Sequence, residues 1–348
     1  MAHELEINAD GTANMVWTNQ KPWHGLGTEM DPKAGALAWM KAAGLDWKIV
    51  KQPMEVTLPN GEKLIVEGKR EGELGVLIRD RGDGTFARSD VFGPAGPEWV
   101  PVQNEQVFEF MDRFCKKGKM TMETCGALKN GTEIWALAKY ASEFDLIKGD
   151  QAKGYLLFHS PHIWGKSTSV RNCIARVVCN NTLTMAFGEK NASIVRMPHI
   201  MEFDTEAQEK VEETLGLAEN QTKVFQEQVA FLSKKKAKAE QVQEFICRIY
   251  QPKTLREREL DNDNSPLMDS FNPSAEKVWD AIQFAPGHDL NGSKGTWWGA
   301  FNGVTYQEDH LRVSHSDDSN LLHSGWFGSG ARRKSQALDL AMEYANAA

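Results

Sequence analysis

The sequence predicts an α+β fold, in which an antiparallel, hairpin-rich sheet backed by helices is followed by a helical C-terminal region. Short apolar segments flank Asn60-Gly61 and Asn130-Gly131, and Asn-Gly in that setting is a strong hairpin signal. After residue 205 the chain becomes rich in charge, with apolar residues at helical spacing. The 348 residues exceed the roughly 100–200 residues of one usual domain.

The first part of the chain is expected to contain a short helix and two hairpins. Residues 32–43 form this helix, with Asp31 as its N-cap, Pro32 at its first position and Gly44 at its end. Turn residues separate the strands that follow it. The two hairpins pair residues 54–58 with 63–66 and residues 74–78 with 85–88.

A second helix is expected before the third hairpin. Residues 104–117 carry apolar side chains at helical spacing. The other elements expected here are a hairpin of 120–128 with 132–140, a strand at 155–158, a buried helix from 177 to 187 that ends at Gly188, and a strand at 193–197.

The last part of the chain is expected to be helical. Its apolar stripe indicates helices that pack on a core or on another subunit, and the members of the stripe are Val211, Leu215, Val224, Phe225, Val229, Leu232, Val242, Phe245, Ile246 and Ile249. A polar loop at 255–273 and helices at 274–284, 296–311 and 333–347 complete the chain. We therefore expect a sheet domain at 1–200 with a nucleic-acid groove, and a helical region at 201–348 for oligomerisation or packing.

The composition is that of a globular protein. Hydrophobic residues make up 41% and charged residues 25% of the chain, which is ample for a core. There is no apolar run of ~18 residues and no secretion signal, so we expect a cytoplasmic protein without a membrane span. The five cysteines form no Cys-x-x-Cys pair, which favours buried, reduced thiols. The net charge of −8 argues against general coating of DNA, but it permits a local basic groove.

Cationic and aromatic residues around the segment from 170 to 187 favour nucleic-acid binding. Arg171 is expected to contact phosphate, because its planar donor fork grips phosphate oxygens. Arg176 either does the same or forms a structural ion pair. Trp164 and Lys166 precede them, and an aromatic ring beside a cation suits single-stranded nucleic acid.

Further candidates keep a structural alternative. Asn180 and Asn181 are expected to hydrogen-bond to bases, although helix capping explains one of them equally well. A basic run on a helix either holds a nucleic-acid backbone or is a solvated face. The predicted nucleic-acid-binding residues are Trp164, Lys166, Arg171, Arg176, Asn180, Asn181, Lys234, Lys235 and Lys236.

No catalytic, metal or cofactor site is expected. The chain lacks a phosphate-binding glycine loop, a His-Glu-x-x-His pair and a nucleophile elbow. Asp309 and His310 are adjacent on a predicted helix and cannot chelate a metal from one face. The loop from Trp23 to Gly27 is either a binding loop or a turn held by a packed tryptophan.

Three segments carry a resemblance to a known family. They are Trp23-His24-Gly25-Leu26-Gly27-Thr28, the run from Val170 to Phe187, and Gly295-Thr296-Trp297-Trp298-Gly299-Ala300-Phe301-Asn302. Together and in this order they resemble the phage- and plasmid-related family of unknown function. The order of predicted elements also resembles single-strand annealing proteins of the Red-beta, RecT and Erf type. That resemblance implies a curved sheet that holds DNA in a groove, and subunits that assemble into rings or filaments.

The leading hypothesis is an ATP- and metal-independent protein of phage or plasmid recombination that binds and anneals single-stranded DNA. It would be a homo-oligomer in the cytoplasm of a bacterial host. The alternative is a phage or plasmid protein that acts on a host factor, as anti-defence proteins do, with no nucleic-acid role. A cryptic nuclease or nucleotide-processing enzyme is less favoured, because the clustered carboxylates of a two-metal site are not evident.

Overall fold

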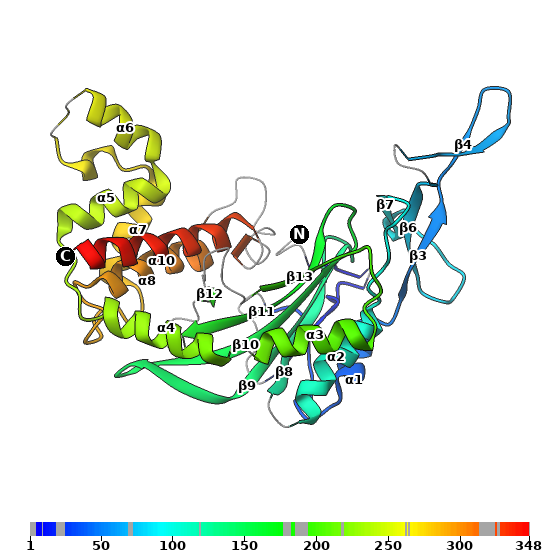
Figure 1. Ribbon diagram of the computed structural model, residues 1–348, viewed down its shortest axis with the longest axis horizontal. Coiled ribbons are helices and arrows are strands. Elements are labelled where there is room, and N and C mark those ends of the chain that lie inside the picture. Colours follow the sequence, from blue (N-terminus) through cyan, green and yellow to red (C-terminus); the bar gives the residue numbers. More distant parts are fainter. Residues whose placement is uncertain are drawn as a thin grey trace.

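The fold was established from a computed structural model. The structure describes residues 5–8, 10–18, 25–68, 72–117, 120–176, 182–184, 194–216, 219–261, 263, 265–312, 324–325 and 328–347. A long twisted sheet lies in the middle of the molecule, with a helical unit at one end and two small sheets at the other (Figure 1). This arrangement confirms the α+β class.

The main sheet has eight strands in the order β12-β11-β10-β9-β8-β1-β2, and β13 also pairs with β11. All pairs are antiparallel except β1 with β2. The strands are β1 (Met15–Trp17), β2 (Thr28–Glu29), β8 (Met120–Leu128), β9 (Glu133–Ile147), β10 (Asp150–Pro161), β11 (Ser167–Arg176), β12 (Thr182–Thr184) and β13 (Ile194–Pro198). The hairpin around Asn130 and the strand expected at 193–197 are therefore confirmed.

Helices cover one face of this sheet. They are α1 (Ala36–Ala42), α2 (Asn104–Lys116) and α3 (Thr205–Gly216), which lie side by side along it (Figure 1). Helix α2 buries Val107, Phe108, Phe110 and Met111 against the sheet, because residues spaced by three or four share one side of a helix. The expected helix at 104–117 is confirmed.

Two expectations about the first part of the chain are wrong. Helix α1 has Gly35 as its N-cap residue, because the side chain of Asp31 instead accepts a hydrogen bond from the Lys33 amide at 2.9 Å within the preceding turn. The strand that pairs with 75–80 lies at 91–95 and not at 85–88, because residues 88–90 form a short 3-10 helix, η2 (Arg88–Asp90).

The small sheets project from the end opposite the helical unit. One contains β3 (Lys48–Pro53), β6 (Gly75–Asp80) and β7 (Val91–Ala95), and the other is the hairpin of β4 (Glu55–Thr57) with β5 (Lys63–Ile65). This hairpin extends away from the body (Figure 1), and it confirms the prediction made from Asn60-Gly61.

The helical unit has its own apolar core. Its helices are α4 (Glu219–Leu232), α5 (Ala239–Tyr250), α6 (Pro252–Leu260), α7 (Pro273–Phe284), α8 (Trp297–Tyr306) and α10 (Ser329–Ala347), with the 3-10 turn η3 (Leu267–Ser270) and the π-helical turn η4 (Gln307–Leu311). The expected helices at 274–284, 296–311 and 333–347 are thus confirmed. The expected polar loop is wrong over 255–260, where α6 continues after Pro252 at its first position, a position that suits proline.

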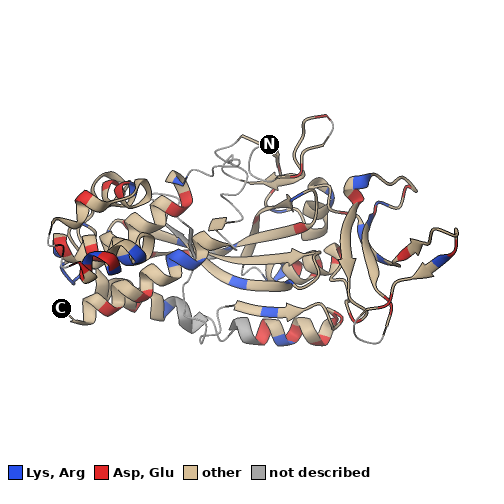
Figure 2. Ribbon diagram, turned by 90° about the horizontal axis from the view of Figure 1, so that it is seen from above, with Lys and Arg blue, Asp and Glu red and all other residues tan. Residues whose placement is uncertain are grey.

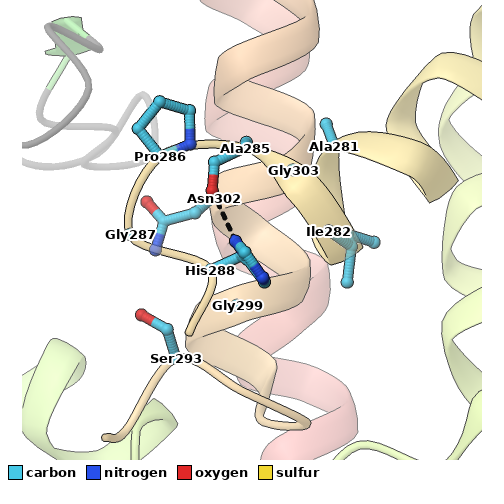
Figure 3. A pocket seen from close by; sticks show the side chains of 10 residues that line it. All are labelled: Ala281, Ile282, Ala285, Pro286, Gly287, His288, Ser293, Gly299, Asn302 and Gly303. Atoms are coloured by element: carbon cyan, nitrogen blue, oxygen red, sulfur yellow. Dashed lines mark hydrogen bonds between the residues drawn. The ribbon is translucent and has the colours of Figure 1, made fainter. Parts of the chain in front are cut away.

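Small residues on α8 let the elements of this unit approach closely. A Cβ atom at Gly303 would collide with Ile282 of α7, and one at Gly299 would collide with the backbone of Ser293. Figure 3 shows both glycines together with Ile282 and Ser293 around the pocket that they line. Trp297, Trp298 and Phe301 of the same segment are buried, so this motif of the chain serves the packing of the unit.

The two cores meet at the sheet. Leu146, Ala152 and Ile174 belong to the helical core, whereas Val211 of α3 belongs to the core under the sheet. The apolar cores therefore divide between α3 and α4, and the expected domain boundary near residue 200 stays a prediction. Within the described part of the chain, no helix combines the length and apolar character that crossing a membrane requires.

The apolar stripe expected between 205 and 250 is used within the chain. Most of its members are buried in the two cores, and these are Val211, Phe225, Val229, Leu232, Val242, Phe245, Ile246 and Ile249. Val224 is 44% exposed, and the side chain of Leu215 lies outside the described residues. Because the chain itself covers the eight buried members, these do not indicate a second subunit.

Candidate nucleic-acid interface

The candidate interface lies at the edge of the main sheet where β11 pairs with β13. Arg171 pairs with Ile194, and Ser169 pairs with Arg196. Directly paired residues lie on the same side of a sheet, and alternate residues of a strand share a face. Arg171, Ser169 and Arg196 therefore share one face, and Val170 between them points to the core under the helices.

Arg171 is a largely buried cation. Its side chain is 9% exposed, and its Nη2 donates a hydrogen bond to Ser169 Oγ at 3.3 Å. Burial lowers the pKa of the Arg171 guanidinium to about 10, and the nearby charge of Arg196 also lowers it. Arg171 remains charged at neutral pH, so it contributes positive potential to this edge.

Arg196 is the exposed partner of this pair. It lies in the middle of β13 with its side chain in solvent, and it forms no ion pair among the residues that the structure describes. Arg196 is not among the binding residues predicted from the sequence. The sequence indicates only that Arg196 lies in the strand expected at 193–197. The pairing of β13 with β11 places it beside Arg171.

The turn between β10 and β11 carries the expected aromatic and cationic pair. Trp164 is 52% exposed, and a Cβ at Gly96 would lie 3.1 Å from its ring, so the ring rests against the Gly96 backbone. Lys166 Nζ lies 3.0 Å from Oε1 of the buried Glu133. The carboxylate of Glu133 also lies 3.1 Å from Lys129 Nζ and 3.0 Å from His159 Nε2.

The remaining predicted residues that the structure describes are not gathered at this turn. Arg176 ends β11 and pairs with Ala152, and its side chain lies outside the described residues, as do Asn180 and Asn181 and the segment 19–24. The expected helix at 177–187 contains strand β12 at 182–184, where pairing with β11 replaces helical hydrogen bonds; its other residues are not described.

The basic run Lys234 to Lys236 was expected on a helix, and this is wrong. It forms the turn between α4 and α5, because the Ala237 amide donates to the Gly295 carbonyl at 3.1 Å and the Lys235 carbonyl accepts from the Trp297 amide at 3.1 Å. This turn lies near the tip of the β9–β10 hairpin, since Gly292 adjoins both Ser233 and Ile147.

The basic run and the Trp164 turn are therefore at opposite ends of the sheet. The length of β10 from Asp150 to Pro161 separates them, roughly 36 Å at about 3.3 Å per residue. Figure 2 shows Lys and Arg interspersed with Asp and Glu at both ends of the molecule.

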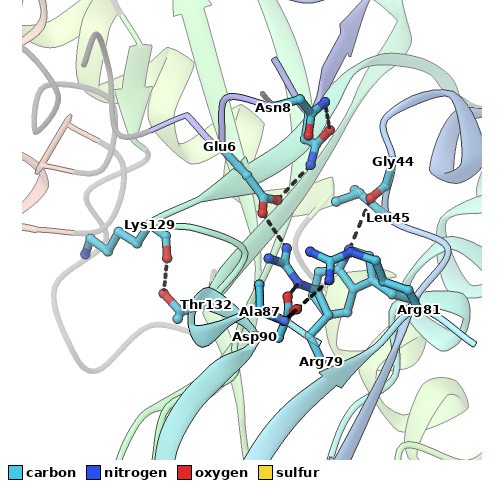
Figure 4. Close-up of polar contacts among 12 residues, drawn as sticks. Glu6, Asn8, Gly44, Leu45, Arg79, Arg81, Ala87, Asp90, Lys129 and Thr132 are labelled. Carbon is cyan, nitrogen blue, oxygen red and sulfur yellow. Dashed lines mark hydrogen bonds and ion pairs between the residues drawn. The ribbon is translucent and has the colours of Figure 1, made fainter. Parts of the chain in front are cut away.

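Two other charged clusters are internal. In the first, Arg79 donates to Glu6 and to Asp90 at 2.7 Å, and Arg81 lies 2.5 Å from Asp90 (Figure 4). Burial acts to raise the pKa of Asp90, but hydrogen bonds from Arg81, the Ala87 amide and Arg79 outweigh it and hold this pKa at about 2. This cluster joins the N-terminal segment to the small sheet.

The second internal cluster is centred on η4. The carboxylate of Glu308 accepts a hydrogen bond from Tyr250 at 2.8 Å and lies 3.4 Å from Arg333, and Asp309 lies 2.7 Å from the buried Lys334. Asp309 is thus engaged with a lysine. Among the described residues, no group of three or more His, Cys, Asp or Glu side chains is placed to hold a metal ion.

A comparison with protein families matches residues 91–336, more than half of the chain, to the family described as Domain of unknown function (DUF932). The chain belongs to this family. The DUF932 domain extends from β7 into α10 and contains Trp164, Lys166, Arg171 and Arg196, so the candidate interface lies inside it. Searches of the curated proteins and of the solved structures find no match to the chain.

Proposed function

We propose that this protein binds single-stranded DNA at the β11–β13 edge and acts as an annealing or recombination protein of a phage or plasmid. The observation that carries the proposal is the pair of arginines on one sheet face, of which Arg196 is exposed and Arg171 is largely buried. The positive charges of two neighbouring guanidinium groups repel each other. A phosphate bound beside them relieves that repulsion.

The mechanism uses only side chains of this edge. Arg196 grips a phosphate directly, while the buried charge of Arg171 raises the positive potential at that point. Trp164 and Lys166 extend the surface beyond the end of β11 and provide a stacking ring and a second cation. Base edges along the rest of the strand stay free to pair, and the binding needs neither ATP nor a metal ion.

The Arg196→Ala variant tests this proposal. It should bind a labelled single-stranded oligonucleotide more weakly than wild type, as measured by fluorescence anisotropy between ~50 and 200 mM salt. Loss of one phosphate contact should reduce the slope of log K against log salt by about 0.7. Arg256→Ala is the matched control, because Arg256 is an exposed arginine of α6 that forms no ion pair within the described residues.

The proposal fails if wild type does not bind the oligonucleotide at low salt, or if Arg196→Ala and Arg256→Ala bind equally well. A host protein would then be the better partner. The feature that favours this second candidate is the exposed apolar pair Ile200 and Met201, which are 58% and 59% exposed just after β13.

We also propose that the protein forms a homo-oligomer on DNA, because linked sites raise avidity without new contacts. Light scattering coupled to size exclusion should give a protein mass of at least two chains, each of 39.0 kDa, when oligonucleotide is present and its own mass is subtracted. A protein mass of one chain, 39.0 kDa, with and without oligonucleotide would contradict assembly, even if the bound oligonucleotide adds its own mass to the complex. That result leaves binding at the β11–β13 edge untouched, since the two arginines lie within one chain.

A further inference from the structure

A large cavity opens at the end of the β11–β13 edge. Its volume is about 720 Å³, which is within the range of small-molecule sites. Trp164, Lys166 and Ser167 line it from the β10–β11 turn, and Pro198 and His199 line it from the end of β13. Two residues beyond Arg196 along β13, Pro198 pairs with Ser167, so the cavity continues the row of residues that includes the two arginines.

The walls of this cavity are aromatic and held in place. Trp99 is buried and stacks on His199, with ring centroids 4.6 Å apart and planes inclined by 15°. Both His199 nitrogens are engaged, one with the Val100 carbonyl at 3.0 Å and one with Thr168 Oγ1 at 3.2 Å. A rigid aromatic wall therefore stands in the same cavity as the exposed ring of Trp164.

The charges at the cavity favour a neutral group over a phosphate. Among the described residues that line it, Glu67 and Glu98 contribute two exposed carboxylates and Lys166 contributes one ammonium group. The ammonium of Lys166 is already 3.0 Å from Glu133. Among these lining side chains a phosphate would meet two carboxylates and one ammonium that is already engaged, whereas a nucleobase is uncharged and offers a flat face to an aromatic ring.

We propose that this cavity takes one nucleobase of the bound strand, which stacks on Trp164 while the neighbouring phosphate lies at Arg196. The proposal rests on the DNA-binding function proposed above and adds the residue that anchors a base. Trp164 thereby sets the register of the strand on the sheet edge, and the cavity distinguishes a base-bearing strand from a bare sugar–phosphate chain.

The test compares Trp164→Ala and Trp164→Phe with wild type on two strands of equal length, one with bases and one fully abasic. Trp164→Ala should weaken binding to the base-bearing strand by about 5- to 150-fold, the range for losing one stacked base. It should leave the abasic strand and the salt slope unchanged, because no charge is lost. Trp164→Phe keeps a ring and should recover most of the affinity.

Phe284→Ala is the control, because it removes an aromatic ring that is 75% exposed at the end of α7 in the helical unit. Equal effects of Trp164→Ala on both strands, or none on either, would overturn the base cavity while Arg196-dependent binding still stands. If wild type binds neither strand but binds a free nucleoside through Trp164, the cavity stands and the DNA-binding function falls. Unchanged thermal unfolding of each variant confirms that it is folded.

Discussion

The Arg79→Leu variant should lose about 3–5 kcal/mol of its free energy of unfolding. Arg79 is 2% exposed and lies between the carboxylates of Glu6 and Asp90. Its guanidinium also lies 5.4 Å from the ring centre of Trp47 and 5.6 Å from that of Phe92. Leucine leaves both carboxylates without this cation in a buried setting, and removing one partner of a buried ion pair is strongly destabilising.

Urea denaturation at pH 7 measures the Arg79 effect, with Lys210→Leu as control. Lys210 forms an exposed ion pair with Glu206 at 2.7 Å, and such pairs contribute about 0–1 kcal/mol. The folded-state pKa of Asp90 is depressed from 3.8 to about 2, so its stabilising contribution is present above pH 3.8 and is lost as the pH falls towards 2. The difference in the free energy of unfolding between wild type and Arg79→Leu should therefore become smaller below about pH 4. A loss no larger than that of Lys210→Leu would contradict this account.

Acidification from pH 7 to pH 5 should cost about 2 kcal/mol of stability through His162 alone. His162 is fully buried, its ring stacks on Phe92 with centroids 6.1 Å apart, and its Nε2 lies 3.2 Å from Asn104 Oδ1. Burial lowers the pKa of His162 from 6.5 to about 3. The folded protein therefore keeps this ring neutral at a pH where the unfolded chain protonates it.

The sign of this effect follows from linkage. The unfolded chain binds the additional proton between pH 6.5 and pH 3, so stability is complete above pH 6.5 and falls as the pH drops. His162→Gln should unfold more easily at pH 7.5, because it loses ring packing, but its stability should change less between pH 7 and pH 5. Parallel stability curves for wild type and His162→Gln over that interval would disprove the assignment.

The sequence predicted the elements whose conformation depends on residues that are close together along the chain. Helix α2 was predictable because Val107, Phe108 and Met111 repeat at helical spacing and all three are buried. The hairpin at Asn130-Gly131 was predictable because both residues take the left-handed conformation, with φ of 56° and 85°, which this dipeptide adopts readily.

Elements that depend on distant contacts were not predictable in this way. The basic run at 234–236 looks helical in sequence, but pairing with the loop before α8 ends the helix. A strand was predicted at 85–88, but residues 88–90 form η2 instead, and Asp90 of η2 belongs to the buried cluster around Arg79. In both places a tertiary interaction outweighs local propensity.

Some features of the candidate site were predictable from the sequence, and others depended on contacts between distant residues. The pairing of an aromatic ring with a cation at Trp164 and Lys166 was visible in the sequence, and the structure places both residues on one turn beside one cavity. Arg196 could not be recognised, because only the pairing of β13 with β11 brings it near Arg171, which precedes it by 25 positions along the chain. The engagement of Lys166 by Glu133 was equally invisible, since 33 residues separate them.

The β9–β10 hairpin belongs to two cores at once. Its base carries Ile134 and Phe158 into the core under the sheet, whereas its far end supplies Leu146 and Ala152 to the helical core. At the tip, Asp150 accepts a hydrogen bond from the Trp298 indole at 3.3 Å. A cut between α3 and α4 would deprive the helical fragment of the side chains that close its core and expose the same side chains on the sheet fragment. Neither half is therefore an interchangeable module, and recombination between related genes that breaks the chain at this point would yield two incomplete proteins.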